Sequence, residues 1–269
     1  MSFRGSILAK VTVLVTSFND ERISYTLESL KKQRRQPDEI LVADGGSDKG
    51  IREICERFKV RFEVLPGNVV ETRNQAITLI EDGIVAFIDT DEVAPENWLG
   101  DLVAPIEAGK ADFTGGPTRH LEPKSGPERY LNQIEDYIYS TLIPQSITYL
   151  PMGNSAWKKE IFDKTGGFDL SIAGGGEDYD INLKAVKLGY RGLFVESAFL
   201  YHDQSRVNSY WKLARKRYSY LRATAKTYIK NRSLSHGIRR SSKGRIAHPF
   251  FLVETLLKPI ALADALLRS

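Results

Sequence analysis

The first hundred residues alternate between short apolar runs and segments with the spacing of an amphipathic helix, and no other feature restricts the fold as strongly. Four runs have the length and composition of buried strands: Val11–Thr16, Glu39–Ala43, Val60–Leu65 and Ile84–Ile88. The helical segments between them contain Ile23, Leu27 and Leu30, and then cover Ile51–Phe58 and Val70–Ile80. This alternation predicts an α/β fold with a Rossmann-like, doubly wound, mostly parallel sheet and helices on both faces.

Polar and acidic residues follow three of these strands. They form the segments 16–21 (TSFNDE), 44–48 (DGGSD) and 89–92 (DTDE). Ligands of open α/β sheets bind beyond the carboxyl ends of the strands, so we expect these segments to meet at one rim. Helix capping accounts for the polar residues at 19–20 and 47–48. It does not account for Asp89 and Asp91, because Pro95 indicates that the next helix begins several residues later.

Asp89 and Asp91 place two carboxylates one residue apart at the predicted mouth of a ligand crevice. Gathering carboxylates without a counter-charge is unfavourable. Mn²⁺ or Mg²⁺ accepts one or two protein carboxylates and leaves its other positions to phosphate oxygens and water. The pair therefore predicts a divalent cation that carries a diphosphate.

Composition excludes several other classes of protein. The single cysteine, Cys55, rules out an internal disulfide and a multi-cysteine metal site, and its apolar neighbours predict a core position. Trp98 and Trp157 are also expected in the core. No signal-peptide pattern and no uncharged stretch of 18 residues is present, so we expect a cytoplasmic protein without a membrane span.

At this point the motifs resemble the family 2 glycosyltransferases of the GT-A fold, over roughly residues 10–205. The motifs that carry the resemblance are Thr16-Ser17-Phe18-Asn19, Asp44, Arg73-Asn74, Asp89-x-Asp91, Gly166-Gly167-Phe168-Asp169, Glu177-Asp178 and His202. The first motif lacks the family's usual proline and tyrosine. The Gln-x-x-Arg-Trp motif of processive polysaccharide synthases is absent, which makes transfer of a single sugar the expectation.

The resemblance implies a role for each motif. Donor-binding residues would be Thr16, Phe18, Asn19, Glu21, Asp44, Arg73, Asp89 and Asn154, with Phe18 stacking on the nucleotide base. Asp91 would hold the metal ion with help from Asp89 and His202, while Asp89 either touches the ribose or shares the metal through water. Arg73 would hold Asp44 or approach the nucleotide. Asp203 could orient the His202 ring.

Asp178 is the candidate general base. It opens a helical segment after the glycine run 174–176, and Glu177 beside it would contact the acceptor. The glycines suggest a mobile approach to the base. A carboxylate here could accept the proton of an attacking hydroxyl and give inversion in a single displacement. Capping and the helix dipole also favour aspartate at this position.

The net charge of +4 hides a division between an acidic body and a basic extension. Residues 1–205 have a net charge of −9, whereas residues 206–245 contain 13 Lys and Arg and no Asp or Glu. We predict a catalytic domain at 1–205, with a nucleotide-binding half at about 10–116 and an acceptor half at about 117–205. A helix at 207–231 and an apolar, non-spanning segment would complete the helical extension 206–269.

These features predict an inverting, metal-dependent glycosyltransferase that moves one sugar from a nucleotide-sugar, a UDP-sugar by preference, to a hydroxyl acceptor. That acceptor could be a lipid-linked glycan. The extension would contact an anionic membrane at its inner face or associate with a second subunit, and no nucleic acid is expected. Sugar transfer to a polyprenyl phosphate is the alternative reaction. A non-catalytic module that binds nucleotide-sugar or nucleic acid is the third hypothesis.

Overall fold

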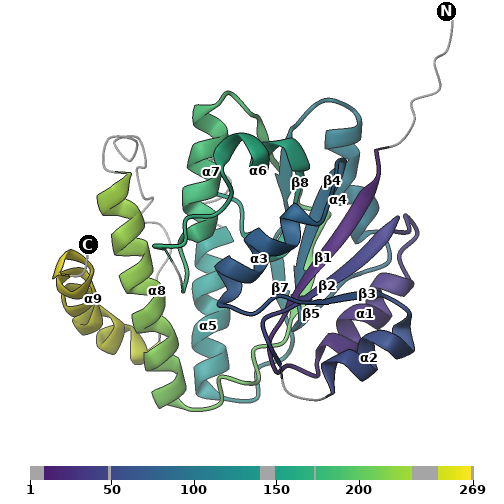
Figure 1. Cartoon of the computed structure of the whole chain (residues 1–269). Coiled ribbons are helices and arrows are strands. Elements are labelled where there is room, and N and C mark those ends of the chain that lie inside the picture. The colour runs from purple at the N-terminus through teal and green to yellow at the C-terminus, as the bar shows by residue number, and fades with distance from the viewer. Residues whose placement is uncertain (1–8, 48–49, 140–148, 173, 232–247, 268–269) are drawn as a thin grey trace, which may run out of the picture.

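The computed structural model describes residues 9–47, 50–139, 149–172, 174–231 and 248–267. A seven-stranded sheet in the order β3-β2-β1-β4-β8-β6-β9 forms its centre (Figure 1). The first four strands along the chain are β1 (Val11–Ser17), β2 (Glu39–Asp44), β3 (Arg61–Val64) and β4 (Ile84–Asp89). The others are β6 (Phe113–Gly115), β8 (Ser155–Lys158) and β9 (Gly192–Phe194). The predicted α/β fold with a mostly parallel sheet is confirmed.

Strands β1 to β4 are parallel, and β8 is the antiparallel strand inserted between β4 and β6. Because β1 pairs with both β2 and β4, Thr16 lies opposite Ala43 on one side and Asp89 on the other. The register brings the polar segments after these strands to one rim, as predicted. Each of the four predicted strands is present, with ends that differ by no more than one residue.

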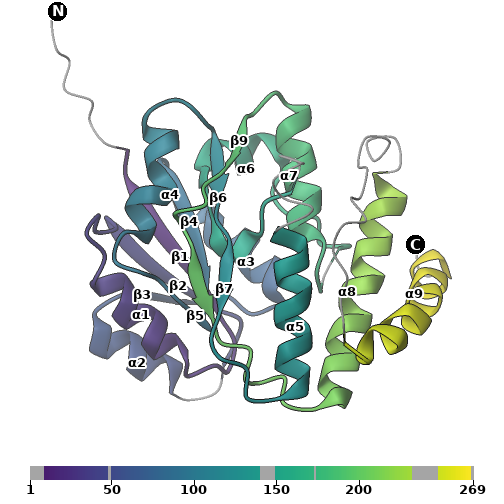
Figure 2. The same cartoon turned by 180° about the vertical axis from the view of Figure 1, so that it is seen from behind.

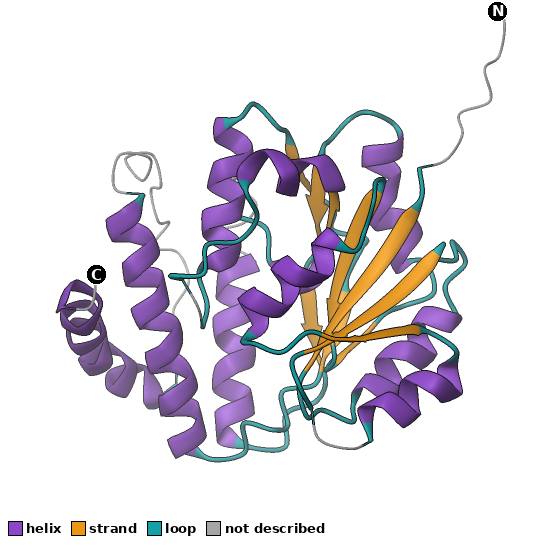
Figure 3. Ribbon diagram, in the orientation of Figure 1, coloured by secondary structure: helices purple, strands orange, loops and turns teal. Residues whose placement is uncertain are grey.

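Helices cover both faces of the sheet (Figure 3). Alternate residues of β1 point to opposite faces: Val13 packs in one core cluster and Leu14 in the other. The first cluster includes residues of α1 (Ile23–Lys31), α2 (Ile51–Phe58) and α4 (Trp98–Glu107). The second includes residues of α3 (Val69–Thr78), α6 (Lys159–Thr165) and α7 (Glu177–Lys187). Cys55, Trp98 and Trp157 are buried as expected.

A second, three-stranded sheet runs in the order β5-β10-β7 and positions one wall of the site. Its strands are β5 (Glu92–Val93), β7 (Thr118–His120) and β10 (Leu200–His202). Antiparallel pairing of β10 with β5 places His202 directly opposite Glu92, three residues after the end of β4. Residues more than a hundred positions apart in the chain thereby share one rim.

The C-terminal part forms two helices, α8 (Tyr210–Lys230) and α9 (Phe250–Leu267). Both predicted helical segments are thus present, although residues 232–247 of the basic extension lie outside the described part. In both views α8 stands beside α5 (Gly126–Tyr137), and α9 lies on the outer side of α8 (Figure 1 and Figure 2). A third core cluster, which includes Tyr130, Leu213 and Phe250, joins these helices. No helix in the described residues is long and apolar enough to cross a membrane.

Candidate active site

A cleft of about 1580 Å³ opens beyond the carboxyl ends of β1 and β4. Eight of the residues predicted from the sequence line it: Thr16, Arg73, Asp89, Asp91, Asn154, Glu177, Asp178 and His202. The remaining four, Phe18, Asn19, Glu21 and Asp44, lie at the same rim but outside the lining. Asp44 is the last residue of β2, and the other three follow β1. The predicted residues therefore divide into a group in the cleft and a group beside it.

The group beside the cleft is organised by Asp44. Its buried carboxylate accepts hydrogen bonds from the backbone N–H groups of Gly46 and Ser47, at 3.0 and 2.6 Å, so it fixes the loop after β2. The Ser47 hydroxyl accepts a hydrogen bond from the Asn19 backbone N–H at 2.7 Å. The Phe18 ring is 61% exposed, which leaves its face open to a planar ligand.

Arg73 does not hold Asp44, contrary to one of the two roles expected for it. The guanidinium is only 4% exposed and lies 2.9 Å from Asp89 Oδ1 and 3.5 Å from Glu177 Oε1. Glu177 Oε2 also accepts the backbone N–H of Gly175 at 3.0 Å. The long reach of arginine across the cleft links the end of β4 to the start of α7, a contact that sequence spacing does not indicate.

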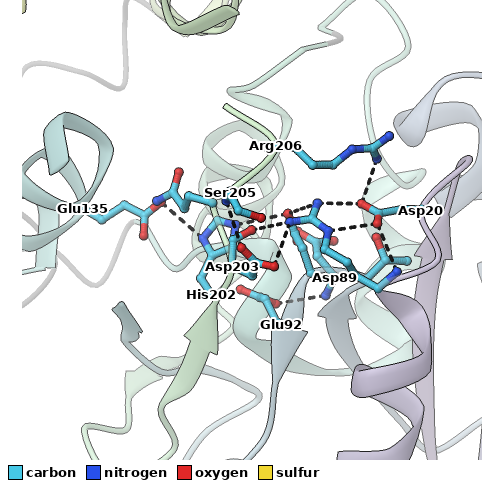
Figure 4. A network of polar contacts seen from close by, with 12 residues as sticks. Asp20, Asp89, Glu92, Glu135, His202, Asp203, Ser205 and Arg206 are labelled. Carbon is cyan, nitrogen blue, oxygen red and sulfur yellow. Dashed lines mark hydrogen bonds and ion pairs between the residues drawn. The ribbon is translucent and has the colours of Figure 1, made fainter. Parts of the chain in front are cut away.

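Figure 4 shows the polar network at this rim, which includes Asp89, Glu92 and His202. Asp91 lies between two cations. Its Oδ2 is 3.2 Å from Arg22 Nη2 and 3.4 Å from His202 Nε2. Burial alone would raise the pKa of Asp91, but the hydrogen bond and charge of His202, together with Arg22, lower it to about 2. Arg22 also pairs with Asp20 at 2.7 Å and with Asp203 at 3.5 Å. Arg22 therefore forms ion pairs with three carboxylates at the rim, those of Asp20, Asp91 and Asp203.

His202 is oriented by Glu135 of α5 rather than by Asp203. The His202 Nδ1 atom lies 3.4 Å from Glu135 Oε1, whereas Asp203 contacts Ser205 and Arg22. Burial would lower the pKa of His202, but the charges of Glu135 and Asp91 hold it well above 6.5. The expected role of Asp203 is therefore wrong, because its side chain turns toward the end of β1 instead.

Glu92 explains how three carboxylates fit within four residues. It is 4% exposed and accepts the backbone N–H of Asp89 at 3.0 Å. Burial, reinforced by the charge of Asp89, raises the pKa of Glu92 well above its usual value of 4.5. Of the three, Asp89 pairs with Arg73 and Asp91 pairs with Arg22, whereas the burial of Glu92 disfavours its charged form.

Asp178 lies at the first turn of α7, in the same cleft. Its Oδ2 accepts a hydrogen bond from the Tyr149 hydroxyl at 3.0 Å, and its Oδ1 accepts the Tyr179 backbone N–H at 2.8 Å. Burial, followed by the charge of Glu177, raises the pKa of Asp178 to about 7. A carboxylate with this pKa is matched to proton transfer near neutral pH.

The glycine run before α7 is packed against α8, which contradicts the expectation of a mobile approach. Gly174, Gly175 and Gly176 have φ values of 94°, 112° and 112°. A Cβ on Gly175 would lie 2.5 Å from Tyr220 Cδ1, and one on Gly176 would lie 2.8 Å from Thr227 Oγ1. The glycines are needed because the backbone turns left-handed under a helix that leaves no room for a side chain.

Asn154 lines the cleft, but its side chain is used by the protein. The amide Nδ2 donates to the carbonyls of Pro117 and Ala198, both at 2.9 Å, and Oδ1 accepts the Trp98 indole N–H at 2.8 Å. The side chain therefore fixes the short 3-10 helix Met152–Asn154 beneath the cleft. Its donor-binding role stays a prediction.

The donor atoms at Asp91 and His202 fit a divalent cation, although among the described residues no three His, Cys, Asp or Glu side chains converge as a metal site. Two ligands bound about 2.1 Å from one ion at roughly a right angle lie about 3 Å apart. The 3.4 Å separation of Asp91 Oδ2 and His202 Nε2 is close to this. A carboxylate on the other ring nitrogen, here Glu135, is the usual partner of a metal-bound histidine.

Sequence reasoning missed Arg22, Glu135 and Tyr149. Arg22 lies one residue beyond the first acidic segment, so its position was the available signal. Glu135 and Tyr149 reach the site only through tertiary structure, and no local pattern marks them.

The fold and the acid-rich rim are those of the GT-A class of sugar-transferring enzymes. The chain belongs to glycosyl transferase family 2, whose family model matches residues 12–170. Glycosyltransferase AglE of Haloferax volcanii is 25% identical over 213 residues, which cover 73% of this chain and 68% of that protein. Glycosyltransferase GlyG of Streptococcus pneumoniae is 24% identical over 156 residues, or 55% of this chain and 51% of that one.

Solved structures show the same fold at low sequence identity. A mannosyltransferase from Pyrobaculum calidifontis, in complex with GDP-Man and Mn²⁺, superposes with a TM-score of 0.66 at 16% identity and covers 98% of this chain and 74% of its own. TarS of S. aureus, in complex with UDP-GlcNAc, superposes with a TM-score of 0.57 at 19% identity and covers 96% and 81%. The prediction of a family 2 glycosyltransferase is confirmed.

Proposed function

We propose that this enzyme is an inverting, metal-dependent glycosyltransferase that moves a single sugar from a nucleotide-sugar to a hydroxyl acceptor. The observation that carries the proposal is Asp178, a buried carboxylate whose pKa is raised to about 7, in the same cleft as the pair formed by Asp91 and His202. An acid-rich rim for the donor and a tuned base for the acceptor are the two parts that this reaction requires.

In the proposed reaction the nucleoside lies against Phe18 and the loop fixed by Asp44, and the diphosphate lies near Asp91 and His202. The acceptor hydroxyl attacks the anomeric carbon from the side of Asp178. The bond from that carbon to the diphosphate oxygen breaks as the new glycosidic bond forms. The hydroxyl proton passes to Asp178, and the nucleoside diphosphate leaves. One displacement of this kind inverts the anomeric configuration.

Asp91, Asp89 and His202 would hold Mn²⁺ or Mg²⁺. When bound, the ion neutralises the charge that develops on the departing diphosphate. His202 must give up its proton to serve as a ligand, and Glu135 on its Nδ1 keeps Nε2 directed at Asp91. The Mn²⁺ named with the Pyrobaculum calidifontis mannosyltransferase supports this assignment.

We infer a UDP-sugar as the donor, and the UDP-GlcNAc named with TarS supports it. GDP-mannose, named with the Pyrobaculum calidifontis enzyme, is the donor to test beside it. Incubation with UDP- and GDP-sugars and Mn²⁺ should produce slow donor hydrolysis, with inversion of configuration in the sugar released by water attack. Nucleotide binding without hydrolysis of any donor would favour the non-catalytic module.

Transfer to a polyprenyl phosphate is the second candidate reaction. The observation that favours it is the set of cations on α8, including Arg215 and Lys216, in the lining of the cleft. A phosphate acceptor is already anionic and needs no general base. Asp178→Asn therefore separates the two reactions: turnover should fall at least 100-fold with a hydroxyl acceptor and stay near normal with a phosphate acceptor.

A lipid-linked glycan at the inner face of an anionic membrane is the acceptor that we propose. Exposed apolar residues of α9 and the cations of α8 support it, since the two kinds of side chain together suit an interface of anionic lipid. The cleft reaches the same helix, because Phe251 and Lys258 of α9 are in its lining. The division of the chain after residue 205 stays a prediction, and α8 contributes directly to the cleft.

A further inference from the structure

One face of α8 forms a wall of the cleft. Half of its lining residues recur four positions apart, a spacing that keeps successive side chains on the same side of a helix: Lys212, Lys216, Tyr220, Thr224 and Tyr228. The other lining residues of α8 flank them: Arg215, Arg217, Ser219, Leu221 and Thr227. The face is cationic in the first two turns and aromatic or hydroxyl-bearing in the later turns. The aromatic part adjoins the catalytic base, since Tyr220 packs on Gly175 just before α7.

Contacts on two sides fix the position of this helix. Leu213 is fully buried in the cluster with Tyr130 and Phe250, and Arg217 pairs with Glu254 of α9 at 2.7 Å. On the other side the helix rests on the glycine run. Lys216 is one turn before Tyr220 and adjacent to Arg217, so its direction is set by residues that are themselves held in place.

Among the cations at the metal end of the cleft, Lys216 differs from the arginines. Arg22 is shared among carboxylates of the rim, and Arg73 is paired with Asp89 and Glu177. Within the described part of the chain, Lys216 has no hydrogen bond or ion pair. Its side chain lines the same cleft as Asp91 and His202. It is a cation available for an anionic ligand.

We propose that Lys216 is a phosphate-binding residue of the donor site and contacts the β-phosphate of the nucleoside diphosphate opposite Asp91. The inference rests on the proposed function. It adds α8 as a wall of the donor site, and this helix lies beyond the residues 12–170 that the family model matches. An ammonium at this position neutralises charge on the leaving group from the side opposite the acidic rim. Helix α8 then belongs to the catalytic machinery and not only to a membrane-facing extension.

The test is calorimetric titration of the full chain with UDP, UMP, GDP and GMP in the presence of Mn²⁺. Lys216→Gln should weaken binding of the diphosphate roughly 10-fold, the loss expected when one charge-assisted hydrogen bond is removed. Binding of the corresponding monophosphate should change less than about 2-fold, because the β-phosphate is missing. Lys216→Arg should restore most of the affinity for the diphosphate.

Lys226→Gln is the matched control, since Lys226 is on the same helix but outside the lining of the cleft. Thermal unfolding of each variant checks that the fold is intact. Equal loss for the monophosphate and the diphosphate, or no loss for either, would overturn the assignment of Lys216. If Lys216→Gln reduced turnover only with a polyprenyl phosphate acceptor, the residue would bind the acceptor and the proposal would be wrong. Failure of the unmodified protein to bind any nucleotide would overturn the proposed function as well.

Discussion

The hydroxyl of Tyr149 donates a hydrogen bond to Asp178 Oδ2 across 3.0 Å. Burial, together with the charge of Asp178, holds the pKa of Tyr149 well above 10, so the phenol keeps the proton that it donates to this carboxylate. The bond favours the ionised carboxylate and opposes the effect of burial, which raises the pKa of Asp178 to about 7. Tyr149 therefore tunes the base from a loop that precedes it by almost thirty residues.

Replacing Tyr149 by phenylalanine should shift the acidic limb of the pH–rate profile upward by roughly one unit, because a hydrogen bond to a charged group contributes about 1.5 kcal/mol. In the proposed mechanism activity requires ionised Asp178, and it should therefore rise as pH increases through about 7 in the unmodified enzyme. The measurement is kcat for donor hydrolysis between pH 5 and pH 9. Tyr190→Phe is the control. An unchanged limb would show that Tyr149 does not act on the base.

Asp178→Asn should lower turnover and, at the same time, stabilise the ligand-free fold at alkaline pH. The folded-state pKa of about 7 is above the ordinary value of 3.8, so the folded protein binds this proton more tightly than the unfolded chain does. Asp178 therefore destabilises the folded protein increasingly as pH rises from about 4 to 7, and this effect reaches its full size above pH 7. We expect a Tm gain of about 3–8 °C at pH 8.5 and little at pH 4. A fall in Tm at both pH values would contradict the raised pKa.

The parts of the site that sequence could predict are those fixed by local pattern. The apolar runs Val11–Thr16 and Ile84–Ile88 predicted two buried strands of a parallel sheet, whose carboxyl ends share one rim. The position of Asp178 at a helix start is equally local. Each of these follows from residues within about ten positions of one another.

The parts that could not be predicted depend on which distant elements pack together. His202 has a carboxylate as its immediate neighbour in sequence, Asp203, yet its ring is held by Glu135 of α5. Alternation along an extended strand end turns neighbouring side chains to opposite sides, so adjacency was misleading. The glycines before α7 suggested a mobile segment. In the structure α8 packs so closely on them that any larger side chain would clash.

Asp91→Asn should remove the dependence of nucleotide affinity on Mn²⁺ while leaving a residual, metal-independent affinity. The amide is a poorer ligand, and it also lacks the charge that holds Arg22 and His202. Calorimetric titration with UDP or GDP, with Mn²⁺ and with a chelator, gives the two affinities. Asp203→Asn is the matched control, because Asp203 pairs with the same arginine but is outside the lining of the cleft. Preserved metal dependence in Asp91→Asn would exclude this metal site.

Gly175→Ala should destabilise the fold by about 2–4 kcal/mol, because the new Cβ combines a strained φ of 112° with a 2.5 Å approach to Tyr220. Gly109→Ala separates the two effects: its φ is 67° and no atom lies within 4 Å of the added Cβ, so only backbone strain applies. Chemical denaturation measures both. Tyr220→Ala should lower the free energy of unfolding by less in the Gly175→Ala variant than in the unmodified protein. An equal loss of unfolding free energy in both proteins would show that Tyr220 of α8 does not limit the space at Gly175.

The final prediction concerns the outward face of α9. Both of its carboxylates turn inward: Glu254 pairs with Arg217 at 2.7 Å, and Asp264 pairs with Arg222 at 3.0 Å. Apart from Lys258, its exposed large side chains are apolar: Phe251, Leu252, Val253, Leu256, Ile260, Leu262, Leu266 and Leu267. An anionic bilayer suits this face, since the basic residues of α8 lie beside it and no acid of α9 faces outward. Binding to vesicles of anionic and zwitterionic phospholipid should therefore be measurable at low salt.

Sedimentation with these vesicles tests the prediction. Binding should weaken between 0.1 and 1 M salt, because the Debye length falls from about 10 Å to about 3 Å and only the apolar contribution persists. The double variant Leu252→Asp with Leu256→Asp should stay in the supernatant, since both side chains are 71% exposed and each change places a charge in the interface. Leu193→Asp, on β9, is the control with an exposed leucine elsewhere. A protein that ignores vesicles at low salt but dimerises through α9 in analytical ultracentrifugation would show that the face binds a second copy, because the same apolar surface would then be covered by protein.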